Sequence, residues 1–183
     1  MHGPASPGWL LVALCAATGA YCVLRMRSGV EEQRRAAGGD ALMGFGMAAM
    51  AVPAAVFTPP SWTWPLYAAV FGAAALRAVW AVRRSPHHLH HLVGTLAMVY
   101  MAVVMAVSPG SGHHAHGGGA GVPLVTGVLL LYFTGYVLLT GVRLVPDAVA
   151  DGAAGLGWGD RPELARACRL SMGIGMVAML LTL

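Results

Sequence analysis

Six long apolar runs divide the 183-residue chain. A helix needs about 20 predominantly apolar residues to cross the hydrocarbon core of a bilayer. We expect six such helices, over residues 9–26, 41–57, 64–82, 89–107, 122–144 and 162–181. Only 10% of the residues are charged and 57% are hydrophobic, whereas a soluble domain carries about a quarter charged residues. So little charge cannot cover a water-facing surface, and the sequence predicts an all-α integral membrane fold.

The charged residues predict the orientation of these helices. All 11 basic residues are arginines, and they fall near the connections after the first, third and fifth runs. The positive-inside rule makes those connections cytoplasmic, and the acidic residues lie on the same side. An even number of crossings then predicts a multi-pass protein of the cell membrane with both termini on the extracytoplasmic side.

Three expected helix starts on the cytoplasmic side carry capping residues. Asp40 precedes the second run and the Ser85-Pro86 pair precedes the fourth, where a side-chain acceptor and a first-turn proline favour a helix start. Asp160 and Glu163 have the spacing of a capping box before the sixth run. We therefore expect Asp40 to cap the second helix, with an ion pair to Arg77 as the alternative.

The second, fourth and sixth runs resemble one another. They read MGFGMAAMAV from Met43, GTLAMVYMAV from Gly94 and MGIGMVAMLL from Met172. The odd runs match more weakly, and each is followed by an arginine at its inner end. The repeated unit is a helix pair in one orientation, which predicts three parallel repeats about an axis along the membrane normal. One membrane domain, 1–183, would hold repeats at about 8–57, 62–107 and 122–183.

Methionine is concentrated in the even runs. Of the ten methionines after Met1, nine lie there, and spacings of four and seven residues place them on one helical face. The residues of these methionine stripes are Met43, Met47, Met50, Met98, Met101, Met105, Met172, Met176 and Met179. Aligning the repeats gives two complete columns, Met47/Met98/Met176 and Met50/Met101/Met179, while Gly94 interrupts a third.

The stripes have two interpretations. Thioether sulfur is a soft ligand that suits Cu(I), so two stacked rings of three sulfurs would form a copper site if the stripes face a common axis. The alternative is packing, because flexible methionine side chains fill irregular gaps between helices. The small residues near the methionines favour close helix approach, which fits the packing interpretation.

Histidine forms two clusters. His87, His88, His90 and His91 begin the fourth run. Pairs such as His87 and His91 share a helical face and could bind zinc or copper, whereas the alternative is a polar first turn at the membrane interface. The second cluster, His113, His114 and His116, lies in a Gly-rich outer loop, where it predicts weak metal binding or only a flexible polar loop.

The three cysteines do not form a disulfide framework. Cys15 and Cys22 lie seven residues apart on one expected helix, about 10 Å along its axis, which is too far for a disulfide. Cys168 stands alone in the sequence and would flank the methionine site on the cytoplasmic side. We expect all three to behave as small hydrophobic residues.

The chain also resembles a known family. The segments HHLHHLVGTLAMVYM, from His87, and LSMGIGMVAMLL, from Leu170, are similar to an uncharacterised family of actinobacterial multi-pass membrane proteins, domain of unknown function 5134. The resemblance covers nearly the whole chain and implies a membrane location without an established activity. In that family such helices often begin with histidine, whereas Asp40 and Arg169 stand near that place here.

Three classes of function remain open. The first hypothesis is a membrane protein that binds or transports copper, with the lipid bilayer as its surroundings and no nucleic-acid partner. The second is a structural or accessory membrane protein, monomeric or homo-oligomeric, whose methionines only pack. A di-iron enzyme is the third, although the chain has one His-x-x-His-His motif where such enzymes need several. The sequence contains no nucleophile elbow, phosphate loop or dinucleotide fingerprint, so nothing in it favours an enzyme.

Overall fold

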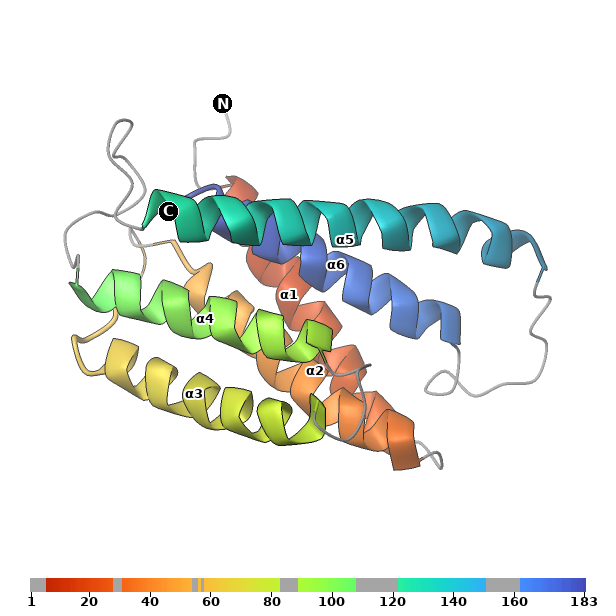
Figure 1. The fold of residues 1–183 in the computed structure, drawn as a ribbon, viewed down its shortest axis with the longest axis horizontal. Coiled ribbons are helices and arrows are strands. Elements are labelled where there is room, and N and C mark those ends of the chain that lie inside the picture. Colours follow the sequence, from red (N-terminus) through yellow and green to blue (C-terminus); the bar gives the residue numbers. More distant parts are fainter. Residues whose placement is uncertain are drawn as a thin grey trace. The chain divides into compact units, whose positions relative to one another are not determined.

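The computed structural model describes residues 6–27, 31–53, 56, 58–82, 89–107, 122–150 and 162–183. The described chain is helical, with no strand in these ranges. The helices are α1 (Ser6–Arg25), α2 (Glu31–Met50), α3 (Thr63–Val82), α4 (Leu89–Val107), α5 (Pro123–Ala150) and α6 (Pro162–Leu180) (Figure 1). The prediction of an all-α fold with six long helices is confirmed.

The second helix does not have its predicted bounds. It begins at Glu31 and ends at Met50, whereas the sequence predicted residues 41–57. Asp40 is therefore an interior helix residue, and its prediction as the cap is wrong. The early end follows from Pro53, which lacks an N–H donor and cannot continue a helix. At the early start, Arg35 and Glu31 form an exposed ion pair one turn apart, an arrangement that stabilises a helix.

The fifth helix is longer than predicted. It continues to Ala150, so the predicted end of this helix at residue 144 is wrong. The prediction ended the helix where the apolar run ends, but a helix continues into polar surroundings as long as its backbone hydrogen bonds are made. The predicted caps at Ser85-Pro86 and Asp160 lie outside the described residues.

Four of the described helices are long and apolar enough to cross a membrane. The qualifying segments are Pro7–Arg25, Thr63–Ala81, Leu89–Val107 and Pro123–Arg143, on α1, α3, α4 and α5. The other two helices are more charged, with five charged residues in α2 and three in the first half of α6. The structure thus supports a membrane-embedded helical protein through four of its six helices.

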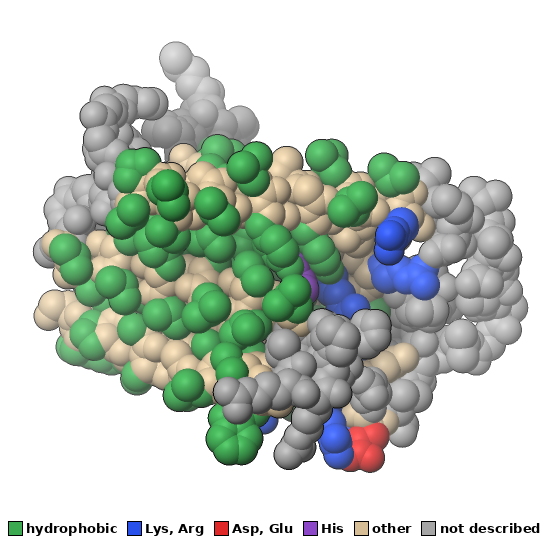
Figure 2. All heavy atoms as spheres, in the orientation of Figure 1, with side chains coloured by type: hydrophobic (Ala, Val, Ile, Leu, Met, Phe, Trp, Pro, Cys, Tyr) green, Lys and Arg blue, Asp and Glu red, His purple; other side chains and the backbone are tan. Residues whose placement is uncertain are grey.

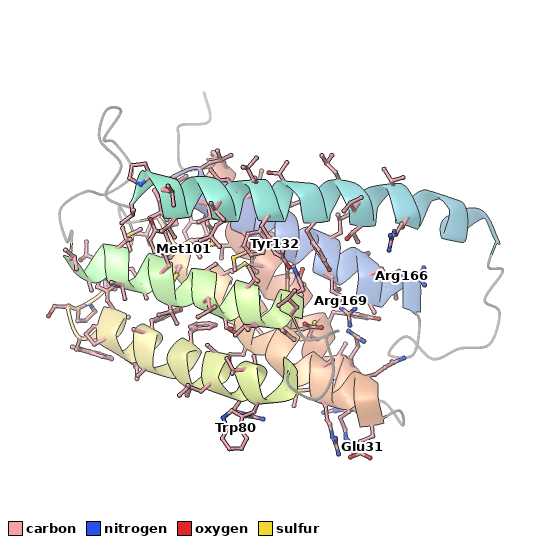
Figure 3. The ribbon with its side chains drawn as sticks, in the orientation of Figure 1. Glu31, Trp80, Met101, Tyr132, Arg166 and Arg169 are labelled. Carbon is pink, nitrogen blue, oxygen red and sulfur yellow. The ribbon has the colours of Figure 1, made fainter. Side chains whose placement is uncertain are left out.

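The outer faces of the apolar helices carry large hydrophobic side chains. Only 11% of the α3 segment and 6% of the α5 segment is buried within the protein. Trp80 projects away from α3 (Figure 3), and Leu131 and Leu138 are exposed on α5. Hydrophobic side chains are spread over the face drawn in Figure 2. Such exposure is unfavourable in water by about 25 cal/mol per Å², whereas hydrocarbon surroundings accept it.

The chain is organised as two compact units. Unit 1 comprises Met1–Pro53 and Leu131–Met179, and unit 2 comprises Ala54–Leu130 and Leu180–Leu183. In unit 1, α1 packs against α2, and in unit 2, α3 packs against α4. Helix α5 begins in unit 2 and continues in unit 1, where it contacts α6.

The α1–α2 pair has a close crossing at two glycines. A Cβ atom on Gly44 would lie 2.9 Å from the backbone N and Cα of Gly19, and 3.1 Å from the carbonyl oxygen of Cys15. Real side chains do not approach backbone atoms this closely, so only glycine at position 44 allows the observed separation. Small residues have this role at contacts between membrane helices.

The two ends of the α1–α2 pair show that the helices are antiparallel. At one end, the Cβ position of Gly8 lies 3.3 Å from Cγ of Pro53. At the other end, Arg25 pairs with Asp40. The stretch of α1 from Gly8 to Arg25 measures roughly 25 Å at the rise of an α-helix. This length is close to the roughly 30 Å hydrocarbon thickness of a bilayer.

Candidate functional site: buried sulfur and charge

The methionine stripes face the protein interior. In the first complete column, Met47 and Met98 are 0% exposed and Met176 is 1% exposed. Met101 is buried in the second column, where Met50 and Met179 are half-buried. The remaining stripe residues are Met43 and Met172, which are buried, and Met105, which is half-buried.

The three aligned segments share one pattern of burial. Phe45, Leu96 and Ile174 occupy the third position of their segments, and all three are exposed. The two residues before and the two residues after each of them are buried. The same face of α2, α4 and α6 is therefore turned inward. The odd helices do not share one packing pattern, because Gly19 of α1 is closely packed whereas a Cβ atom on Gly72 of α3 or Gly135 of α5 would meet nothing within 4 Å.

Sulfur atoms from α1 and α2 come together beside α6 in unit 1. A Cβ atom on Gly175 would lie 3.3 Å from Sγ of Cys15 and 3.7 Å from Sδ of Met47. Both sulfurs thus lie within 4 Å of one point on α6, and the next residue, Met176, is also buried. Met47 and Met176 were predicted from the sequence as site residues. Cys15 was not, because its contact with α2 and α6 leaves no signal in local sequence spacing.

A second sulfur contact joins α1 to α6. The thiols of Cys22 and Cys168 lie close enough to interact with each other. Cys22 is fully buried and Cys168 is half-buried. Cys168 stands alone in the sequence but lies near Cys22 in the structure, because the fold brings together two helices that are distant in the sequence. We refer to Cys22 and Cys168 as the thiol pair.

A buried ion pair lies beside the thiol pair. Nη1 of Arg25 is 3.6 Å from Oδ2 of Asp40, and the two side chains are 2% and 5% exposed. This separation exceeds a normal hydrogen bond. Within the described part of the chain, Nε and Nη1 of Arg25 have no hydrogen-bond partner. Leaving such donors unsatisfied in the interior costs about 1–3 kcal/mol, and more for a charged group. Arg25 and Asp40 both act electrostatically on Cys22 and Cys168.

Further polar side chains of α5 and α6 lie in the same unit. Tyr136 on α5 is hydrogen-bonded to Thr140 and lies within electrostatic range of Arg169 and Asp40. Its ring approaches α6 closely, with Cδ1 at 3.5 Å from the Cβ position of Gly173. Arg166 and Arg169 both lie in the first half of α6 (Figure 3). The charged side chains of α1, α2 and α6 therefore occupy one end of unit 1.

The histidine cluster belongs to unit 2. His90 and His91 lie in the first turn of α4 and are half-buried. The other two members of this cluster, His87 and His88, lie outside the described residues. The outer cluster of His113, His114 and His116 also lies outside them. Among the described residues, no three His, Cys, Asp or Glu side chains form a group that could hold a metal ion. The described part of the histidine cluster therefore adds no metal site of ordinary composition.

These features define a helical protein with apolar outer faces and an interior that contains sulfur and charge. The chain belongs to the family described as Domain of unknown function (DUF5134), whose model matches residues 32–183. The predicted resemblance to domain of unknown function 5134 is thereby confirmed over these residues. No curated protein and no solved structure matches the chain. The matched region contains Asp40, Met47 and Cys168, whereas the residues that α1 contributes precede it.

Proposed function

We propose that this protein is a multi-pass protein of the cell membrane that binds Cu(I) through buried sulfur ligands. The observation that carries the proposal is the meeting of Cys15 Sγ and Met47 Sδ at Gly175, next to the buried Met176. Thiolate and thioether sulfur are soft ligands that suit Cu(I), although thiolate also binds zinc and iron–sulfur clusters. Three helices supply these sulfurs, so a metal bound there would be held by the tertiary structure.

Six membrane crossings form part of the proposal. Helix α2 is too charged to qualify by composition, but its charge is concentrated before Ala41. Its only charged residue after Arg35 is Asp40, which is buried against Arg25. The remaining part of α2 packs along α1 as far as Pro53. The α1–α2 pair therefore has the neutralised interior that a membrane hairpin needs.

The shared burial pattern of α2, α4 and α6 supports the three-repeat arrangement in this proposal. Each segment turns the same methionine positions inward.

Metal content after purification tests the proposal. We expect copper, measured by elemental analysis, to be retained by the wild-type protein and to fall to background in a Met47→Leu/Met176→Leu variant. Leucine preserves the volume of methionine closely enough to keep the fold. Met26→Leu is the matched control, because Met26 is exposed and lies outside the stripes. A double variant with wild-type copper content would contradict a thioether site.

A structural or accessory role is the competing proposal. It is favoured by the close packing of α1 and α2 at Gly19 and Gly44, because a stripe of methionines beside small residues also fills a helix interface well. It predicts wild-type protein without copper, together with lower thermal stability when Met47 and Met176 are replaced by smaller alanines. Those two measurements separate packing from metal binding.

A further inference from the structure

We infer that Gly175 is the positioning residue of the Cu(I) site, and that this site occurs once per chain, in unit 1. Because Gly175 has no side chain, two sulfurs have room to converge on an ion beside the backbone of α6. The inference rests on the proposed function for the metal itself. It adds which residue admits the ion and how many ions each chain binds.

A side chain at residue 175 would face both sulfurs. Its Cβ atom would lie 3.3 Å from Sγ of Cys15 and 3.7 Å from Sδ of Met47. The third neighbour would be Cδ1 of Leu11, also at 3.7 Å. The distance to the thiol is shorter than in most real Cβ contacts, so a methyl group at this position would press on the side chain of Cys15.

An ion requires the two sulfurs to approach each other. Metal–sulfur bonds measure about 2.3 Å, so a shared ion brings Sγ of Cys15 and Sδ of Met47 to within about 4.6 Å of each other. The methionine side chain is flexible enough to make this movement. A methyl group on residue 175 would lie against both sulfurs and hinder their convergence.

The charge of the complex suits an apolar interior. When Cu⁺ replaces the thiol proton of Cys15, one proton is released and the Cu(I)–thiolate unit is neutral. The thioether of Met47 adds no charge. A divalent ion bound in the same way keeps a charge of +1, and a buried charge without a partner is unfavourable.

Charged residues do not adjoin the site along its helices. On α1, α2 and α6, the charged residues nearest to Cys15, Met47 and Gly175 are six to ten residues away. These intervals are roughly 9–15 Å at the rise of an α-helix. A neutral Cu(I) complex needs no charged partner, and the site therefore favours Cu(I) over a divalent ion.

Unit 2 lacks both features of this site. Every cysteine of the chain lies in unit 1, so unit 2 has no thiol. In the aligned segment of α4, Ala97 stands at the place of Gly175, and it is fully buried. Its methyl group takes the place on the helix that Gly175 leaves empty. We therefore expect the methionines of α4 to pack without binding copper.

A Cu(I) titration of the purified full-length protein in detergent tests the inference. The probe is Cu(I) alone, added without oxygen in competition with a chromogenic Cu(I) chelator. We expect the wild-type protein to bind one ion per chain. Gly175→Ala should lower the affinity by about tenfold or more, the size of an overpacking penalty. Gly141→Ala is the matched control and should bind as the wild type does, because its Cβ atom would meet nothing within 4 Å.

Thermal unfolding of the metal-free protein separates positioning from packing. The atom nearest to a methyl group at residue 175 is Sγ of Cys15, which can turn aside, and alanine favours helix. We therefore expect metal-free Gly175→Ala to unfold at nearly the wild-type temperature. A clearly lower unfolding temperature together with lost copper binding would overturn the assignment, because Gly175 would then serve packing alone.

The remaining outcomes separate this inference from the proposed function. Wild-type copper affinity in Gly175→Ala would overturn the inference alone. Two or more ions of similar affinity per wild-type chain would overturn the single site, whereas Ala97→Gly should leave the number at one. Wild-type protein that yields all its Cu(I) to the chelator overturns the inference and the proposed function together.

Discussion

At the residue scale, Arg25 and Asp40 show how a membrane-type interior accommodates charge. Both side chains are almost completely buried, and each offsets the charge of the other. Burial of an ion pair contributes little net stability, but removal of one partner leaves an uncompensated charge in the interior. The pair therefore fixes the register of α1 against α2, since any shift along the helices would separate the two groups.

Single and double substitutions of this pair should differ in the size of their effect on stability. We expect Asp40→Leu or Arg25→Leu alone to destabilise the fold by about 3–5 kcal/mol, and the double variant to recover most of this loss, because a neutral apolar pair needs no compensation. Thermal unfolding in detergent measures both. Glu31→Ala is the matched control, because the Glu31–Arg35 pair is exposed and its loss should cost less than about 1 kcal/mol.

At the element scale, the contact between α1 and α2 depends on glycine residues, which have no side chain. Gly44 faces the backbone of Gly19, so the helices approach each other more closely than any larger residue permits. Backbone atoms cannot move aside as a flexible side chain can. The separation of the two helices is therefore set by these glycines, and it places Cys15 and Met47 against α6.

Alanine substitutions at two glycines should have opposite effects. We expect Gly44→Ala to destabilise the protein by about 1–3 kcal/mol, the usual result of overpacking. Gly72→Ala on α3 should be neutral or slightly stabilising, because its Cβ meets nothing within 4 Å and alanine favours helix. The measurement is the unfolding midpoint in detergent. Equal effects of the two substitutions would contradict the close crossing.

At the scale of the whole molecule, charge determines the expected orientation. Arginine is found near the connections after α1, α3 and α5 and not near those after α2 and α4, so we predict both termini on the extracytoplasmic side. A phosphatase fused to either terminus should be active, because that enzyme folds only outside the cytoplasm, and a fluorescent protein at the same positions should be dark. A fluorescent C-terminal fusion would refute the topology. Fusion after Arg84, in the connection that follows α3, is the matched control and should give the reverse pattern.

The sequence by itself determined the helical class and most of the helix bounds. Residues 89–107 match α4, and residues 162–181 differ from α6 by one residue, because apolar run length is a local property of the chain. It also indicated which methionines are buried, since the stripes lie on one face of each helix. Family membership was likewise visible in short segments of residues.

Only the tertiary structure decided the position of Asp40 and the composition of the sulfur sites. An acidic residue before an apolar run has the pattern of a cap, and what allows it inside α2 is the guanidinium of Arg25 on another helix. Cys22 and Cys168 come together for the same kind of reason, since α1 and α6 pack side by side at that level. Local spacing records which residues share a face of one helix. Which helix faces pack against each other depends on the shapes of their surfaces. In this protein the glycines at the helix contacts determine how closely the helices approach.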